Sequence, residues 1–159
     1  MDERVDRETA SRTDDHQALR LWLRLLTCTQ LIEREVRARL RERFNTTLPR
    51  FDLMSQLWRY PAGLKMNELS AHLMVTGGNV TGIVDLLEKE GQVERAAEPA
   101  DRRAFRVRLT RAGRRAFGEM AGAHEDWILE LLAGMSRREQ AEVYRLLGRL
   151  KEVTMEAKS

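Results

Sequence analysis

The spacing of apolar residues changes near residue 92, and this change constrains the fold more than any other feature of the sequence. Residues 80–87 place apolar side chains at i, i+3, i+4 and i+7, the pattern of a helix with one buried face. From Gln92 to Thr110 apolar residues instead alternate with arginine or glutamate, which predicts two short antiparallel strands. Residues 98–103 between them predict a polar turn with charged flanks. The chain is therefore expected to form a helix followed by a small hairpin.

Helical spacing recurs on both sides of this hairpin. Pro49 fits the first turn of one helix, and Ser136 with Glu139 has the spacing of a capping box at the start of another. The predicted helices span residues 17–44, 49–59, 67–73, 76–91, 111–133 and 137–157. The fold class is thus mainly α with a small β-hairpin wing (α+β). Its centre, a helix, a tight turn, a helix and a hairpin, is a winged helix-turn-helix arrangement flanked by long helices.

Charge is distributed unevenly along the 159 residues. Residues 1–15 carry six acidic side chains against three arginines and almost nothing apolar, which predicts a disordered acidic tail. Because the whole chain carries +3 and this tail −3, the expected single domain at 16–159 carries +6. Seven arginines fall within residues 101–115 against one aspartate. Such a run is either a solvated face or a phosphate-binding patch, and its place in the hairpin favours the patch.

The start of the helix before the hairpin is suited to reading DNA. Residues 76–82 combine glycines, which let a backbone approach closely, with an asparagine and two threonines that can hydrogen-bond to bases or phosphates. A helix N-terminus also presents free N–H groups and a positive dipole end to phosphate. The arginines of the hairpin can then enter the neighbouring minor groove or hold its phosphates. Double-stranded DNA is therefore the predicted partner.

Several segments resemble the MarR family of bacterial transcriptional regulators. They are residues 75–85 (VTGGNVTGIVD), 87–91 (LEKEG) and 101–113 (DRRAFRVRLTRAG), and with the flanking helices the resemblance covers about 17–157. It implies a winged-helix core at about 48–110 and a homodimer joined through helices at about 17–45 and 111–157. Each copy then reads one half of a pseudo-palindrome. The predicted first helix, apolar nearly all round at its start, also suggests a partner chain.

The resemblance assigns DNA contacts to Thr76, Gly78, Asn79, Thr81 and Arg103. Asp101 is expected to orient an arginine, because phosphate repels a carboxylate, and Arg102 is expected to contact the backbone. Lys65 stands where such proteins often have a capping serine or threonine, so this helix start is expected to use a phosphate contact or water. Leu86 replaces a residue that is often basic, which removes one expected backbone contact.

Members of the family typically release DNA when a small, often aromatic, acid binds between the dimer helices and the DNA-binding lobe. The candidate ligand-binding residues are Trp22, Arg24, Phe51, Met54 and Trp58. Core packing is the alternative explanation of the aromatic residues, and a solvated face that of the arginine. Residues 21–29 and 48–53 also resemble regulators of aromatic-acid breakdown, some of which respond to hydroxycinnamoyl-CoA thioesters. The protein is thus expected to be a repressor released by an aromatic acid or its CoA thioester, with no other cofactor.

The sequence is also compatible with other functions. Cys28, the only cysteine, is either a redox switch or a buried inert thiol, and burial is the simpler interpretation. Zinc at His72 or His124 is another alternative, and a helical interaction module that does not bind DNA is a third. No nucleophile–base pair or complete catalytic motif can be assembled, so no enzyme is predicted. With no signal segment and no apolar stretch of about 20 residues, a cytoplasmic location without membrane contact is expected.

Overall fold

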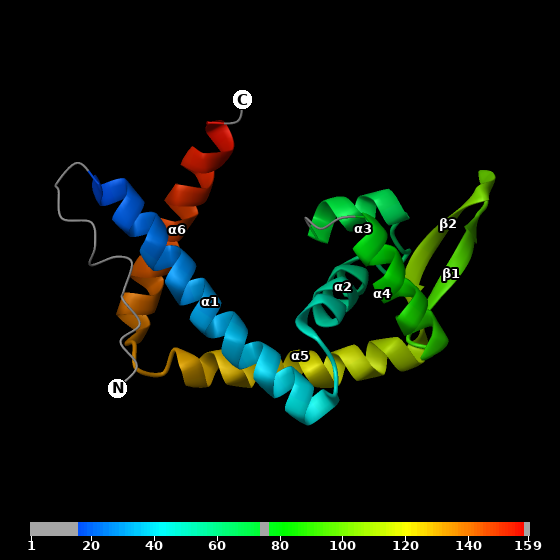
Figure 1. The fold of residues 1–159 in the computed structure, drawn as a ribbon, viewed down its shortest axis with the longest axis horizontal. Coiled ribbons are helices and arrows are strands. Elements are labelled where there is room, and N and C mark those ends of the chain that lie inside the picture. Colours follow the sequence, from blue (N-terminus) through cyan, green and yellow to red (C-terminus); the bar gives the residue numbers. More distant parts are fainter. Residues whose placement is uncertain (1–15, 74–76, 158–159) are drawn as a thin grey trace. The chain divides into compact units, whose positions relative to one another are not determined.

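The computed structural model describes residues 16–73 and 77–157 and contains two compact units, residues 1–123 and 124–159 (Figure 1). Along the chain the elements are α1 (Gln17–Phe44), α2 (Leu48–Arg59), α3 (Met66–Leu73), α4 (Gly77–Lys89), β1 (Val93–Glu98), β2 (Asp101–Leu109), α5 (Arg111–Leu131) and α6 (Arg137–Glu156). The predicted class, mainly helical with one hairpin, is confirmed. None of the helices formed by the described residues is both long and apolar enough to span a membrane.

Local sequence accounts for the helix ends of the first unit. α1 has the predicted bounds and ends before Asn45, whose left-handed backbone (φ 48°) closes the helix. Thr47 caps α2 by accepting a hydrogen bond from the N–H of Arg50 at 3.4 Å, and Pro49 lies in the first turn as predicted. Gly91 after α4 has φ +73°, which confirms the predicted left-handed cap.

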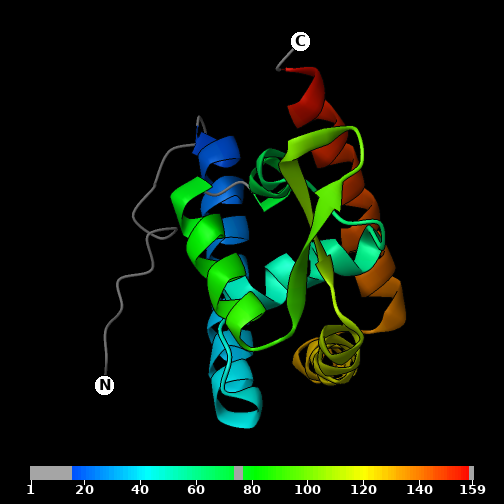
Figure 2. The same ribbon diagram turned by 90° about the vertical axis from the view of Figure 1, so that its right-hand side faces the viewer.

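The hairpin is longer than the sequence predicted. β1 and β2 lie side by side as a twisted hairpin (Figure 2). They pair antiparallel in regular register as far as Ala97 and Phe105, and then Glu98 pairs with Asp101. The predicted turn over 98–103 is therefore wrong, because residues 99–100 alone connect the strands. The shift of register leaves residues 102–104 as a bulge in β2, a feature that increases the local twist of a strand.

A third backbone segment joins the hairpin at Leu64. Its N–H and C=O exchange hydrogen bonds of 2.9 and 2.8 Å with Val107, an antiparallel bridge that the sequence did not predict. The preceding Gly63 has φ +91°, and a Cβ there would lie 2.7 Å from the Val107 carbonyl oxygen. Glycine is thus required where the chain enters α3.

The core of the first unit lies where the apolar faces of its helices meet the inner face of the hairpin. α2 packs against α3, α4 and β2. Three of the four apolar positions on the predicted buried face of α4 are fully buried, Val80, Val84 and Leu87, whereas Ile83 is half-buried. The remaining core residues include Val36, Leu40, Leu53, Leu57, Leu69, Val93, Val107 and Phe117.

The start of α5 is fastened to the turn between α4 and β1. The Thr110 hydroxyl donates to the Gly91 carbonyl at 2.6 Å and accepts from the N–H of Gly113 at 3.0 Å, so it caps α5. The N–H of Thr110 also donates to the Gln92 carbonyl at 3.1 Å. Gly113 lies so close to Gln92 that a Cβ would fall 1.9 Å from that carbonyl oxygen. These contacts give a physical reason for the Leu-Thr-x-x-Gly segment at 109–113.

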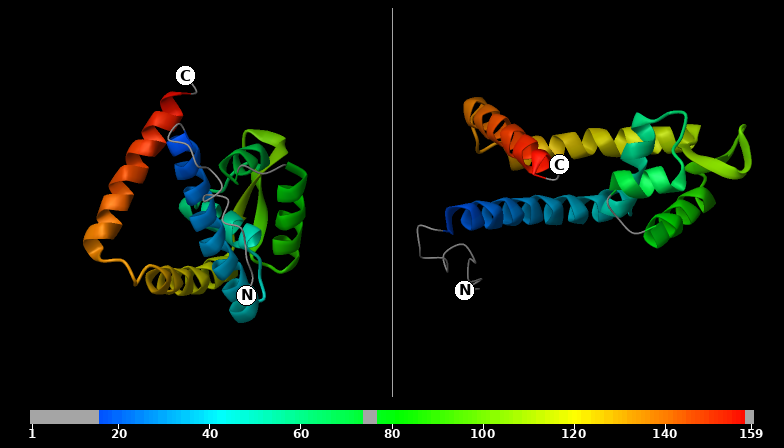
Figure 3. Two further views of the ribbon diagram at one scale, coloured as in Figure 1. Left: turned by 60° about the vertical axis from the view of Figure 1, so that its left-hand side comes forward. Right: turned by 90° about the horizontal axis from the view of Figure 1, so that it is seen from above.

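The second unit contains the end of α5 and the whole of α6, which is a single uninterrupted helix in both views of Figure 3. The predicted capping box is confirmed: Ser136 accepts from the N–H of Glu139 at 3.3 Å, and the Glu139 carboxylate accepts from the N–H of Ser136 at 2.8 Å. No residue of α6 is buried. Its apolar positions 143, 146, 150 and 153 have the 3-4-3 spacing of a helix seam and are all exposed.

Candidate nucleic-acid interface

The exposed face of α4 carries the polar residues that the sequence assigned to DNA. Asn79 and Thr81 are exposed, whereas Val80 between them is buried. A Cβ at Gly82 would meet nothing within 4 Å, so this side of the helix is open. Gly78 is the second residue of α4, and Thr76 lies outside the described residues. The exposed face of α4 can therefore contact base edges while Val80, on the opposite face, stays packed in the core.

The bulge near the hairpin tip presents two arginines. Arg102 and Arg103 are exposed, and within the described part of the chain neither side chain has a hydrogen-bond or ion-pair partner. The Asp101 carboxylate accepts a hydrogen bond from the backbone N–H of Arg103 at 2.9 Å. The expectation that Asp101 orients an arginine fits this geometry, although the contact is made to the backbone and not to the guanidinium.

Other arginines of the predicted patch have partners inside the protein. Arg106 donates to Glu98 at 2.6 Å, and Arg108 donates to Glu94 at 2.6 Å, both across the hairpin. The guanidinium of Arg114 lies 5.8 Å from the ring centre of Trp58. Three arginines of the patch expected over 101–115 are thus engaged within the protein. The other four are exposed and have no hydrogen-bond or ion-pair partner among the described residues: Arg102 and Arg103 in the bulge, and Arg111 and Arg115 on α5.

Arg95 of β1 links the hairpin to α4, a role that the sequence reasoning missed. Its guanidinium donates to Asp85 at 2.5 Å and to Glu88 at 2.7 Å, and it lies 5.3 Å from the ring centre of Phe105. The hydrogen bond to Asp85 raises the pKa of Arg95 above its ordinary value, and the charge of Glu88 adds to this effect. Two charge-assisted bonds from one side chain therefore hold hairpin and helix together.

Lys65 caps α3 in a way that the sequence reasoning did not anticipate. Its backbone N–H donates to the Glu68 carboxylate at 2.7 Å, and its carbonyl accepts from the N–H of Leu69 at 2.9 Å. The glutamate therefore performs half of a capping box, whereas the expected contact of the first-turn N–H groups with phosphate or water stays a prediction. The Lys65 side chain, which is half-buried, keeps its predicted DNA contact as a prediction.

The five predicted ligand residues are divided between core and surface. Phe51 and Met54 are buried, whereas Trp22 and Trp58 are 56% and 45% exposed. The rings of Phe51 and Trp58 both lie against Phe117, with centroids 5.3 and 5.4 Å apart. The core explanation therefore holds for Phe51 and Met54. Arg24 lines a shallow hollow of about 280 Å³ on α1 with Gln17, Arg20 and Leu21.

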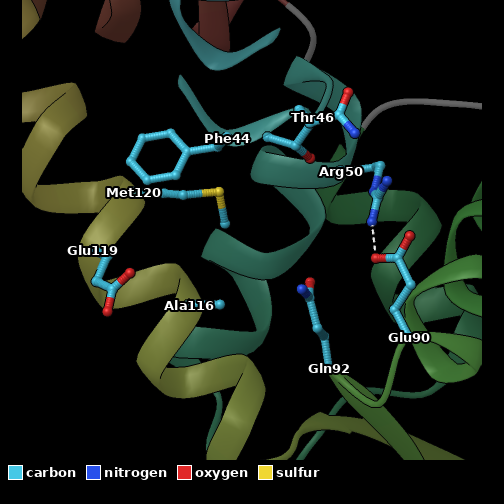
Figure 4. A pocket seen from close by; sticks show the side chains of 9 residues that line it. Phe44, Thr46, Arg50, Glu90, Gln92, Ala116, Glu119 and Met120 are labelled. Atoms are coloured by element: carbon cyan, nitrogen blue, oxygen red, sulfur yellow. Dashed lines mark hydrogen bonds and ion pairs between the residues drawn. The ribbon is translucent and has the colours of Figure 1, made fainter. Parts of the chain in front are cut away.

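A separate cavity of about 260 Å³ lies among α1, α2, α5 and the turn after α4 (Figure 4). Arg50 points across it to an ion pair with Glu90, so its charge is already neutralised. Glu119 adds a second carboxylate to the lining. The cavity therefore offers poor electrostatic complementarity to an acid, which argues against it as the place for an aromatic carboxylate.

Cys28 is exposed on α1, so the expectation that its thiol is buried is wrong. Because the residues near Cys28 in the sequence are apolar, this part of α1 was expected to be buried on all sides. Leu21 is 53% exposed and Leu31 50%, so the chain itself leaves much of this helix uncovered.

α3, α4 and a basic hairpin, built on one core, define a winged helix-turn-helix protein. The MarR family profile matches residues 46–105. A MarR family transcriptional regulator from Silicibacter pomeroyi, of known crystal structure, is 35% identical and superimposes with a TM-score of 0.75. The match covers 90% of this chain and 99% of that one. The chain therefore belongs to the MarR family, whose described members are transcriptional regulators and not enzymes.

Two curated relatives extend the comparison. The HTH-type transcriptional regulator YkoM of Bacillus subtilis is 30% identical over 83 residues, 52% of this chain and 54% of that protein. The chain thus spans about half the length of YkoM. The transcriptional activatory protein BadR of Rhodopseudomonas palustris is 28% identical over 120 residues, 74% of this chain and 68% of that protein.

Proposed function

We propose that the protein is a ligand-responsive DNA-binding transcriptional regulator that works in the cytoplasm as a homodimer on a pseudo-palindromic site. α4 enters the major groove with Asn79 and Thr81, while Arg102 and Arg103 reach the adjacent minor groove or its phosphates. The observation that carries this proposal is the pair of exposed arginines without partners in the described chain, in a bulge fixed by Asp101.

The selective pairing of the arginines supports this assignment. Arg106 and Arg108 neutralise glutamates of the hairpin and strengthen it, so they contribute little free charge. The two arginines of the bulge combine exposure with free donors, which is what recognition of phosphate or of a narrow minor groove requires.

Surfaces that a single chain leaves uncovered support the proposed homodimer. α6 has 20 residues and none is buried, yet Val143, Leu146, Leu150 and Val153 form an apolar seam. A soluble helix with such a seam needs a partner, and an identical chain supplies a matching seam. The exposed Leu21, Trp22 and Leu31 extend the argument to α1.

For the effector we propose a small aromatic acid or its CoA thioester. The support is the hollow on α1, which Arg20 and Arg24 line together with Gln17 and Leu21, so that it presents positive charge to an acid. Repression is the proposed sign of regulation. Since BadR is named as an activatory protein, a promoter fusion has to decide this sign for the present chain.

Fluorescence anisotropy with the DNA upstream of its own gene tests the proposal. The titration is run against scrambled DNA, at two salt concentrations, with and without aromatic acids and their CoA thioesters. Selective binding that ligand reverses is expected, and Arg103→Ala weakens it by roughly 1–3 kcal/mol while the control Arg115→Ala does not. Binding without sequence preference at either salt concentration would overturn the proposal.

If DNA binding is selective but no acid or thioester reverses it, the effector proposal fails and the regulator remains. Peroxide treatment of wild type and of Cys28→Ser then tests the redox alternative. Loss of DNA binding in wild type alone would support a thiol switch.

A further inference from the structure

A second basic surface adjoins α4, outside the hairpin. It is a groove of about 350 Å³ to which α1, the loop after it, α2 and α4 all contribute. None of the described residues that line it is acidic. The lining residues are Arg37, Arg41, Thr46, Thr47, Leu48, Pro49, Asn79 and Ile83.

Both arginines of the groove can bind an anion. Arg41 is exposed, and among the described residues its guanidinium has no hydrogen-bond or ion-pair partner. Arg37 pairs with Glu33 at 3.1 Å, but the two side chains are 56% and 46% exposed, so water screens the pair and it exchanges readily. The groove thus holds one free cation and one that is only loosely engaged.

The ends of two helices add to this positive character. Thr47 and Leu48 are the cap and the first residue of α2, and Asn79 is the third residue of α4. The N-terminal end of a helix carries about half a positive charge and favours anions. Two such ends open on the groove that already contains the two arginines.

Asn79 connects the groove with DNA reading, because it belongs to both surfaces. The major groove of B-DNA is about 12 Å wide and is bordered by phosphates, so a helix inside it has a sugar–phosphate strand on each side. The hairpin is fastened to α4 through Arg95, whereas the groove lies against α1 and α2. Cationic side chains next to α4 are therefore found in two places, on the hairpin and in this groove.

We infer that this groove seats a backbone phosphate of the bound DNA, with Arg41 as the main contact and Arg37 as the second. The inference rests on the proposed function. It assigns α1 a direct part in DNA binding in addition to the dimer contact. Phosphate contacts fix register and orientation without reading sequence, so the groove contributes affinity and salt dependence.

Arg41→Gln and Arg43→Gln form a matched pair for the test. Both arginines lie in the last turn of α1, so each substitution removes one charge from the same helix end, but only Arg41 lines the groove. Anisotropy is measured with operator and scrambled DNA over 50–200 mM salt, about the range in which phosphate contacts dominate. Thermal denaturation confirms that both variants fold.

Each lost phosphate contact lowers the salt slope by about 0.9, so Arg41→Gln is expected to lower it by about 1.8 per dimer. At 0.1 M salt this weakens binding about tenfold or more, equally for operator and scrambled DNA. Arg37→Gln is expected to have a smaller effect of the same kind. Equal slopes for Arg41→Gln and Arg43→Gln would overturn the inference while leaving selective DNA binding intact.

Free inorganic phosphate shares the chemistry of the DNA backbone and is tested separately. Wild type and Arg41→Gln are titrated with inorganic phosphate alone, followed by the amide signal of Asn79. Micromolar binding of phosphate with an unchanged DNA salt slope would assign the groove to a free anion and refute the DNA contact. A wild type that does not select operator DNA would refute the proposed function itself, and the inference with it.

Discussion

Gly113→Ala tests the close approach of α5 to the turn after α4. A Cβ at this position would lie 1.9 Å from the Gln92 carbonyl oxygen and 2.8 Å from its carbon, against a practical limit of 3.0 Å. The backbones would have to separate by about 1.1 Å, the difference between 3.0 and 1.9 Å. Such a movement stretches the two hydrogen bonds that Thr110 makes to the carbonyls of Gly91 and Gln92.

The magnitude follows from these contacts. Two lost hydrogen bonds cost about 1 kcal/mol each, and overpacking adds about 1–3 kcal/mol. Alanine is more favourable than glycine inside a helix by about 1 kcal/mol, which offsets part of this loss. The free energy of unfolding is therefore expected to fall by roughly 2–4 kcal/mol, which lowers Tm by roughly 4–16 °C for a chain of this size.

Thermal and urea denaturation followed by circular dichroism measure this loss, at one fixed protomer concentration because a dimer's stability depends on concentration. Gly118→Ala and Gly122→Ala are matched controls in the same helix, since a Cβ at either position meets nothing within 4 Å. They are expected to be neutral or to stabilise by up to about 1 kcal/mol. If Gly113→Ala is as stable as these controls, the packing argument is wrong.

Three further outcomes are expected. Asp101→Ala is expected to weaken DNA binding by roughly 1 kcal/mol in anisotropy, because Arg103 loses the hydrogen bond that fixes its backbone. Tighter binding would mean that the removed repulsion between the Asp101 carboxylate and DNA phosphate outweighs this loss. Leu146→Arg, in the apolar seam of α6, is expected to yield monomers in sedimentation, and a surviving dimer would exclude this seam as the dimer contact. Hydrogen bonds from Ser136 lower the pKa of Glu139, so its stabilising effect is complete above about pH 4.5 and is lost as the pH falls through the lowered value. Ser136→Ala is therefore expected to flatten the acid dependence of unfolding, and an unchanged profile would contradict the capping role.

Much of the fold could be predicted because its signals are local. The bounds of α1, the cap at Gly91 and the capping box at Ser136 depend on residues within a few positions of one another. The polar face of α4 also follows from periodicity alone, since Asn79 and Thr81 flank the buried Val80.

The rest depends on contacts between distant residues. The bulge beyond Ala97 arises from a shift of strand register, which alternation of apolar and charged residues does not encode. The pairing of Arg95 with Asp85, and the groove shared by Arg41 and Asn79, form only when separate elements pack together. At Cys28 the sequence led to an incorrect prediction. Its apolar neighbours in the sequence predicted a buried thiol, but the rest of the same chain does not cover it.

Arg95 has a consequence for how binding is regulated. It joins β1 to α4 by two ion pairs, which add to the packing of these two elements, so the hairpin and the helix are coupled. Under the proposed function, contacts of α4 in the major groove and of the hairpin in the minor groove would then be gained or lost together. In the proposed homodimer the adjustable quantity would then be the distance between two such hairpin–helix units. The proposed effector would need only to change their spacing relative to the helical repeat of DNA to switch binding off.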